Sequence, residues 1–333
     1  MMHNNIRDQY WDSLKFVLIF LVIYGHTIEL YAPSGSVNRA IYNLIYTFHM
    51  PLFIFVSGRF SQIKDREKYI KGIIKLLETY LVFHIIWQLI VFASGTDFNI
   101  FKFIAIPSWT LWYLVSVIWW RILVLIIPEK ILKGSPVKII AISFFVSILG
   151  GVIPVSSHFS LQRTMAYMPF FFMGYYSIKT DIRKYINKVP LLLALLVIVS
   201  VLFFFYFCLN ENINFILTCR FSYWSKPEVS PILKCVFRCV LVVSAMIICI
   251  MIMRIVPLNQ LIAKWGANTL FIYMYHLFLI RAFRLGVKCG IIPQNEWLLI
   301  VYALLFTICL AYLSRNKYLN RILNPISYIK DRR

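Results

Sequence analysis

The sequence predicts an all-α fold, namely a polytopic membrane helix bundle of about ten transmembrane helices with both termini in the cytoplasm. Three observations support this prediction. Hydrophobic residues make up 61% of the 333 residues and charged residues only 14%, which is more apolar surface than a soluble core needs. The apolar residues gather in runs of helix length, and the basic residues gather in alternate connections between them. We expect a single integral-membrane domain over residues 1–333.

Ten apolar runs account for the predicted helices. In chain order they are 13–32, 41–58, 72–93, 109–127, 137–153, 164–178, 190–209, 231–253, 268–286 and 297–314. A helix rises about 1.5 Å per residue, so runs of this size suit a hydrocarbon layer of roughly 30 Å. No cationic region followed by a small-residue cleavage site opens the chain. The first run is therefore expected to be a retained span rather than a signal peptide.

The lysines and arginines set the expected orientation. If the N-terminus lies inside, the inside segments hold 24 of the 34 basic residues; these segments are 1–15, 59–75, 121–138, 179–189, 254–267 and 315–333. Cytoplasmic loops carry such an excess, so we expect a multi-pass protein of the inner or plasma membrane, in contact with the lipid bilayer. The net charge of +21 does not indicate a nucleic-acid partner, because the basic residues occupy short loops rather than one face.

The seven cysteines lie mostly within apolar runs and form no CxxC pair. This pattern is typical of buried structural thiols, so we expect no metal and no redox site. The sequence carries no signal for the oligomeric state.

The first run (13–32) contains Lys15 near its start and His26 and Glu29 further along. Eleven residues at about 100° each return almost to the starting direction, so Lys15 and His26 share one helix face about 16 Å apart. Glu29, almost one turn beyond His26, could orient its imidazole. An ionisable group within a span is costly and usually functional. The alternative is that Lys15 extends to the lipid headgroups and that His26 is a packing residue.

The second run contains His49 beside Pro51. His49 is expected at a depth similar to that of His26, which suggests a shared polar pocket. Alternatively, His49 satisfies the Thr47 carbonyl, which Pro51 leaves without its usual donor.

Four further residues are candidates for binding. Lys71 and Lys75 share a helix face at the start of the third run, where they are either a solvated face or a docking patch for a phosphorylated cytosolic ligand. Arg163 stands at the outer entrance of the sixth run, where it could bind substrate, anchor an anionic lipid or pair with Glu29. His276 lies within the ninth run and, taken alone, is more typical of a structural residue.

Four segments together resemble the membrane acyltransferase-3 family, in particular its fucose 4-O-acetylase-like branch. They are DSLKFVLIFLVIYGH, FHMPLFIFVSG, RTMAYMPFFFMGYY and WGANTLFIYMYH, in the family's order. The resemblance covers essentially the whole chain. One position differs, because the broader family usually has arginine where this chain has Lys15, which keeps the charge but loses the bidentate geometry.

The resemblance implies an enzyme that moves an acyl group from acyl-CoA to a carbohydrate hydroxyl. Acetyl-CoA is the expected donor and succinyl-CoA the alternative. Lys15, helped by Lys71 or Lys75, would hold the phosphates of coenzyme A. His26, oriented by Glu29, would take the hydroxyl proton as a general base, or would itself carry the acyl group.

The same resemblance implies roles on the acceptor side. His49 and Arg163 would orient the acceptor or stabilise the oxyanion, and His276 would contact the substrate. The expected acceptor is a cell-envelope polysaccharide, such as an exopolysaccharide, or its lipid-linked precursor.

Two other functions fit parts of the sequence. A transporter or flippase of lipid-linked sugars or organic anions would also need many spans and polar pocket residues, but the sequence contains no convincing inverted repeat. A sensory or scaffold module would not need the four segments.

Overall fold

The computed structural model describes residues 8–95, 99–153, 158–220, 230–293 and 295–326. Every regular element within these ranges is helical and none is a strand, which confirms the predicted all-α class. Each of the ten expected apolar runs overlaps a helix.

Several helices are long and apolar enough to cross a membrane. Within the described ranges six qualify, namely Gln9–Ile28, Val37–Arg59, Arg66–Ala93, Trp109–Ile126, Pro231–Ile255 and Gln260–Lys288. A seventh would be the pair Leu298–Leu313 and Lys317–Leu323, which is bent by 96°, while Pro136–Val152 and Leu191–Phe207 are shorter apolar helices. These helices support a multi-pass membrane protein. The count of ten spans and the cytoplasmic termini remain predictions.

The chain divides into two compact units, the first drawn from residues 1–53, 183–212 and 246–317 and the second from 54–182, 213–245 and 318–333. The first contains α1 (Gln9–Ile28), the start of α2 (Val37–Arg59), α9 (Ile182–Ile186), α10 (Leu191–Phe207), the end of α12 (Pro231–Ile255), α13 (Gln260–Trp265), α14 (Thr269–Lys288) and α15 (Leu298–Leu313). The second contains α3 (Arg66–Ala93), α4 (Ile100–Ala105), α5 (Trp112–Ile126), α6 (Glu129–Gly134), α7 (Pro136–Val152), α8 (Leu161–Tyr176), α11 (Asn214–Leu217) and α16 (Lys317–Leu323).

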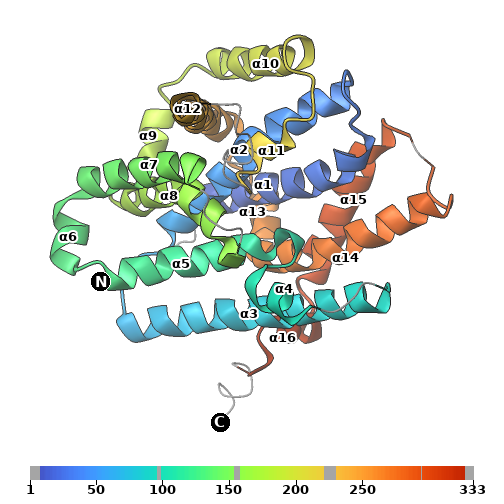
Figure 1. The fold of residues 1–333 in the computed structure, drawn as a ribbon, viewed down its shortest axis with the longest axis horizontal. Helices are drawn as coiled ribbons and strands as arrows, with labels where there is room; N and C mark the ends of the chain where they lie inside the picture. The colour runs from blue at the N-terminus through green and yellow to red at the C-terminus, as the bar shows by residue number, and fades with distance from the viewer. Residues whose placement is uncertain (1–7, 96–98, 154–157, 221–229, 294, 327–333) are drawn as a thin grey trace. The chain divides into compact units, whose positions relative to one another are not determined.

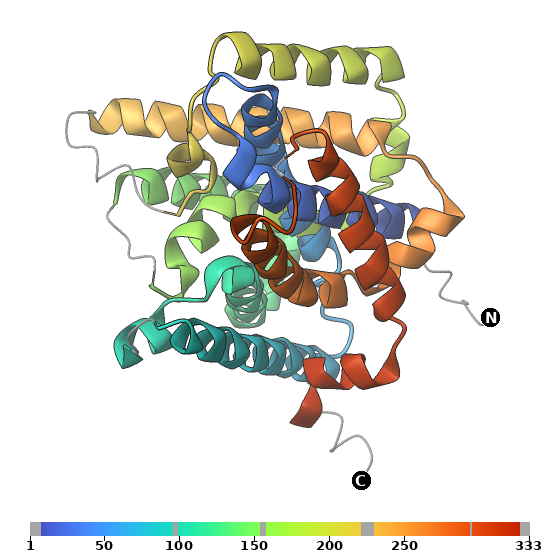
Figure 2. The same cartoon turned by 90° about the vertical axis from the view of Figure 1, so that its right-hand side faces the viewer.

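In the first unit α1 is the central element. It packs against α13, α14 and α15, as Figures 1 and 2 show. The Asp8 side chain accepts a hydrogen bond from the Tyr10 backbone N–H and caps its start. A Cβ at Gly266 would overlap the Asp12 carbonyl oxygen, so glycine lets the backbone after α13 approach α1 closely. This contact fixes the helix that carries the main candidate residues.

In the second unit α7 and α8 lie side by side, and α5 packs against both α3 and α8 (Figures 1 and 2). Gly58 at the end of α2 and Gly174 in α8 allow these two helices to pack closely. A Cβ at Gly58 would overlap the Phe171 carbonyl oxygen, and a Cβ at Gly174 would overlap the Phe55 carbonyl oxygen. The indole N–H of Trp120 donates to the Thr164 carbonyl at 3.1 Å and ties α5 to α8.

Candidate active site

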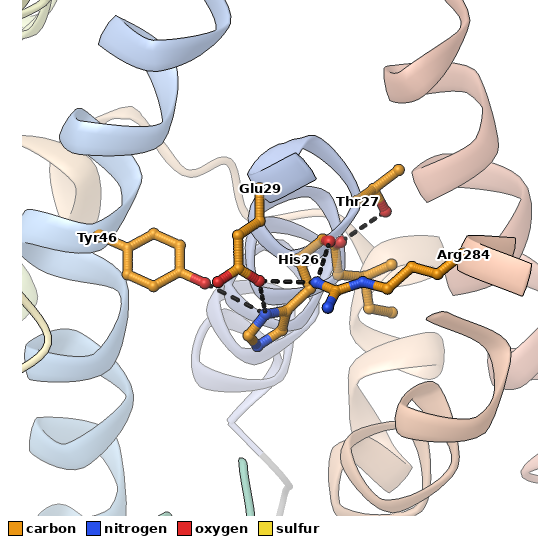
Figure 3. A network of polar contacts seen from close by, with 6 residues as sticks. His26, Thr27, Glu29, Tyr46 and Arg284 are labelled. Carbon is orange, nitrogen blue, oxygen red and sulfur yellow. Dashed lines mark hydrogen bonds and ion pairs between the residues drawn. The ribbon is translucent and has the colours of Figure 1, made fainter. Parts of the chain in front are cut away.

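His26 lies in the last turn of α1, and its side chain is 12% exposed. A single uninterrupted helix carries both Lys15 and His26, as the spacing predicts. The ring nitrogen Nδ1 is 3.2 Å from the Tyr46 hydroxyl and 3.6 Å from Oε2 of Glu29 (Figure 3). Glu29 therefore lies beside the imidazole, where the sequence places it.

Arg284, on α14, completes this network. Its Nη2 donates to Oε2 of Glu29 at 2.7 Å and to the backbone carbonyl of His26 at 3.2 Å (Figure 3). The last carbonyls of a helix lack intrahelical donors, so the guanidinium both pairs with the carboxylate and satisfies the end of α1. Sequence analysis missed Arg284. The sequence feature that could have identified Arg284 is its position about two turns after His276 on the same helix.

Glu29 follows the α1 span and is 30% exposed. Burial alone would raise the pKa of its carboxyl, but a protonated His26 and the Arg284 guanidinium outweigh burial and lower the pKa to about 2. The carboxylate is thus ionised near neutral pH and presents a fixed negative charge to the imidazole.

Tyr46, which sequence analysis also missed, connects His26 with His49. Its ring stacks on Tyr42 with 3.9 Å between centroids and meets the His49 ring edge-on at 4.7 Å. A Cβ at Gly25 would lie 3.0 Å from the Tyr46 ring, so glycine beside His26 leaves room for the phenol. The predicted proximity of the two histidines arises through this shared tyrosine.

His49 is buried within α2, and its Nδ1 lies 2.7 Å from the Ile45 carbonyl oxygen. A carbonyl only accepts, so Nδ1 carries the hydrogen and Nε2 is the acceptor in the neutral ring. The alternative expectation is that His49 bonds to the Thr47 carbonyl, which Pro51 leaves without its usual donor. This is wrong, because His49 bonds to the Ile45 carbonyl instead.

His276 faces His26 from α14. Their ring centroids are 5.7 Å apart and their planes differ by 25°. Nδ1 of His276 donates to the Tyr273 carbonyl at 2.5 Å, which leaves Nε2 as an acceptor. His276 is fully buried, and Nε2 has no hydrogen-bond partner among the described residues. A buried acceptor without a donor is a natural position for a ligand hydroxyl.

The three candidate lysines have different surroundings. Lys15 is 19% exposed and pairs with Asp12 at 2.6 Å. Lys71 is largely exposed and pairs with Glu67 at 2.6 Å, and Lys75 is exposed one turn further along α3. Lys71 and Lys75 belong to the second unit, whereas Lys15 belongs to the first.

Arg163 also belongs to the second unit. Its Nε donates to the Thr218 carbonyl at 3.1 Å, and its guanidinium lies 4.5 Å from the centre of the Trp112 ring. The arginine that pairs with Glu29 within the first unit is Arg284.

The cluster around His26 has the parts of an acid–base site. If Nδ1 carries a hydrogen towards Tyr46 and Glu29, Nε2 is the unprotonated nitrogen that takes a proton, and the carboxylate stabilises the imidazolium that results. No group of three His, Cys, Asp or Glu side chains suited to a metal ion occurs in the part of the chain that the structure describes.

A family model described as an acyltransferase domain, that of the acyltransferase-3 family, matches residues 8–315. The chain belongs to the acyltransferase-3 family. The match runs through both units and includes every residue of the His26 network, so the chain is an acyltransferase-family enzyme.

One curated relative of this acyltransferase-family chain is the nodulation protein NolL of Sinorhizobium fredii (strain NBRC 101917 / NGR234). It is 40% identical over 57 residues, which is 16% of this chain and 16% of NolL. The aligned part therefore spans about a sixth of the length of that relative. No solved structure matches the chain.

Proposed function

We propose that this protein is an integral-membrane O-acyltransferase that moves an acyl group from acyl-CoA to a hydroxyl of a cell-envelope polysaccharide or of its lipid-linked precursor. Acetyl is the proposed acyl group, and the inner or plasma membrane is the proposed location. The observation that carries the proposal is the contact of the His26 imidazole with Tyr46 and Glu29, within a chain matched by the acyltransferase family over nearly its whole length.

His26 is the proposed general base. Its Nε2 takes the proton of the acceptor hydroxyl while the oxygen attacks the thioester carbonyl. The tetrahedral intermediate then collapses, the carbon–sulfur bond breaks, and the proton on His26 passes to the sulfur of coenzyme A. An acyl-imidazole relay is the alternative order of events, in which Nε2 attacks the thioester first.

Glu29 and Arg284 hold the base in place. The carboxylate favours the tautomer with hydrogen on Nδ1 and stabilises the imidazolium. Arg284 anchors both the carboxylate and the helix end that carries His26. His49 contributes through the Tyr46 ring, which it meets edge-on.

His276 is the proposed contact for the acceptor. Its Nε2 is a buried acceptor beside the His26 ring, and a sugar hydroxyl supplies the missing donor. Arg163 is the further proposed substrate-binding residue.

Lys15 is the proposed phosphate contact for the donor, with Lys71 and Lys75 as additional cations. A lysine attracts phosphate as a point charge and does not need fork geometry. The Asp12 carboxylate fixes the position of the Lys15 ammonium.

The test compares base-labile O-acyl groups on surface glycans, measured by NMR, in cells that carry wild-type protein, His26→Ala, Thr27→Val or no protein. Thr27 is a matched control, because it neighbours His26 while its hydroxyl donates only to the Ile23 carbonyl of its own helix at 2.8 Å. The expected result is an acyl signal with wild type and Thr27→Val only. In membranes, the same variants are compared for release of coenzyme A from acetyl-CoA.

An acyl signal that persists with His26→Ala at equal protein abundance would remove His26 as the base. Vesicle translocation of a lipid-linked sugar without any acyl-CoA, unaffected by His26→Ala, would favour the transporter instead. Trapping of an acetyl group on His26, absent in His26→Ala, would identify the relay.

A further inference from the structure

A small, partly open cleft lies in the second unit, and its lining includes none of the residues that form the His26 network. Besides Ile106 and Pro107, its lining consists of two tryptophans, two arginines and two neutral polar residues, namely Trp109, Trp112, Ser160, Gln162, Arg163 and Arg220. The two arginines are the charged residues of the described lining, so this part of the cleft attracts anions.

Arg163 is held in one orientation on the cleft wall. The guanidinium lies over the Trp112 ring, and Nε donates to the Thr218 carbonyl. Trp112 in turn stacks on Tyr167 with 5.7 Å between centroids, and the Tyr167 hydroxyl donates to the Leu217 carbonyl at 3.1 Å. A preorganised guanidinium binds an anion with less loss of conformational entropy than a flexible one.

The segment before α5 forms another part of the lining, and α3 holds it. Nδ1 of His84 accepts from the Ser108 backbone N–H at 3.3 Å, and its Nε2 therefore donates to the Phe103 carbonyl at 2.8 Å. Gln88 donates to the Ser108 hydroxyl at 3.1 Å. These bonds fix the position of the neighbouring Trp109, whose backbone has a φ of +31°. His84 thus supports the cleft wall rather than acting chemically.

The lining of the cleft contains a buried acceptor. Gln162 is fully buried and lines the cleft; its amide nitrogen donates to the Gly150 carbonyl, and its Oε1 has no partner among the described residues. Ser160, beside it, has a φ of +61°, in the left-handed region that is unfavourable for a serine. Uncommon backbone conformations are often found at binding sites, and here two of them line one cleft.

The guanidinium groups, the indole and the amide oxygen of the cleft together indicate the chemical class of its ligand. Guanidinium groups bind phosphate oxygens, the half-buried indole of Trp109 offers an apolar surface for a sugar ring, and the Gln162 oxygen accepts a bond from a hydroxyl. We propose that this cleft binds a saccharide that carries a phosphate group, on the acceptor side of the reaction. This inference rests on the proposed acyl transfer to a glycan and adds the phosphate as a recognition element.

The expected topology favours an acceptor over the donor. Coenzyme A also carries phosphates and an aromatic base, but it is cytosolic. Arg163, Arg220 and Trp109 all lie outside the segments that the charge distribution places in the cytoplasm. A phosphorylated sugar, either free or attached to a lipid, therefore fits the cleft better than the nucleotide end of the donor.

The experiment measures equilibrium binding to the purified full-length protein in lipid nanodiscs, without acyl-CoA. The probes are glucose 1-phosphate, undecaprenyl phosphate-linked glucose, glucose and coenzyme A. Arg220→Gln is the main variant, because Arg220 is exposed and lines the cleft. Arg163→Lys tests the fork geometry. Lys102→Gln is the matched control. Lys102 is exposed on α4 and does not line the cleft, so this substitution removes the same charge from outside the site.

Both phosphorylated probes are expected to bind more tightly than glucose, and Arg220→Gln is expected to weaken them about tenfold, as the loss of a charge-assisted bond implies. Lys102→Gln should leave binding unchanged. If only the lipid-linked probe binds, the source of the phosphate is a lipid carrier; if both bind, the sugar phosphate suffices.

The proposal is overturned if neither probe binds in a way that depends on Arg220 and Arg163, or if these substitutions weaken coenzyme A instead. The proposed function is judged separately, because His26→Ala should abolish transfer while leaving probe binding intact. Binding that is insensitive to the arginines, together with His26-dependent transfer, refutes this inference alone.

Discussion

The guanidinium of Arg284 lies 2.7 Å from the carboxylate of Glu29 and also binds the backbone carbonyl of His26 at 3.2 Å. One side chain of α14 therefore fixes both the end of α1 and the charge beside the imidazole. A misplacement of about 1 Å in a catalytic group can cost on the order of a hundredfold in rate. The role of Arg284 in positioning His26 can thus be measured.

Arg284→Ala is expected to lower the acyl-transfer rate by about ten- to a hundredfold. Arg284→Lys should recover only part of the rate, because Nη2 makes both bonds and an ammonium on a shorter, more flexible side chain keeps the charge without the fixed planar orientation. Arg281→Ala on the same helix is the control, because it removes one positive charge without removing the bonds to Glu29 and His26. Equal losses in Arg281→Ala and Arg284→Ala would contradict a specific positioning role.

Glu29→Gln should alter stability in a pH-dependent way. The native pKa of about 2 lies below the ordinary value of 4.5, so ionisation of Glu29 favours the folded state. This contribution, about 1 kcal/mol or less for a partly exposed pair, is complete above the ordinary pKa and disappears as the pH falls towards 2. Unfolding temperatures of wild type and Glu29→Gln should differ more at about pH 5.5 than at about pH 3.5. A constant difference across this range would be inconsistent with the lowered pKa.

Tyr46→Phe should lower kcat about two- to tenfold, because one net hydrogen bond contributes about 0.5–1.5 kcal/mol. The phenyl ring keeps the contact with His49, so the unfolding temperature should change little. Tyr24→Phe is the control, since Tyr24 stacks on Phe20 within α1. Unaltered kcat in Tyr46→Phe would mean that the hydroxyl does not orient His26.

His276→Phe should raise KM for the glycan acceptor and leave KM for acyl-CoA unchanged. The substitution keeps an aromatic ring but removes Nε2, the buried acceptor without a partner among the described residues. The expected rise is about tenfold, the cost of one unmade buried hydrogen bond. Steady-state kinetics with each substrate varied in turn separates the effects. A rise confined to KM for acyl-CoA would contradict this role and would indicate that His276 contacts the donor instead.

Gly266→Ala should destabilise the protein by about 1–3 kcal/mol, as overpacking of a close contact does. The new Cβ would overlap the Asp12 carbonyl oxygen, which is backbone and cannot move aside alone. Gly134→Ala is the matched control, because nothing lies near a Cβ there. Thermal unfolding of both variants measures the difference, and equal stability would show that the backbone after α13 can move away from α1.

Local sequence features predicted much of the fold. The apolar runs indicated where helices lie, because burying backbone polar groups in a membrane requires them to bond within a helix. The eleven-residue spacing placed Lys15 and His26 on one face of a continuous helix, and the i,i+3 spacing placed Glu29 beside His26. The four family-like segments predicted the acyltransferase-3 family, which the match over residues 8–315 confirms.

The contacts between distant segments could be decided only by the tertiary structure. Arg284 is 255 residues from Glu29, and no periodicity relates two such positions. The stacking of His276 on His26 and the link from His26 through Tyr46 to His49 likewise depend on how α1, α2 and α14 pack. The sequence by itself determined the helical class, the family and the helix that carries the proposed base. Packing determined which charges and rings surround that base, because helices specify their own faces but not the side chains that meet them.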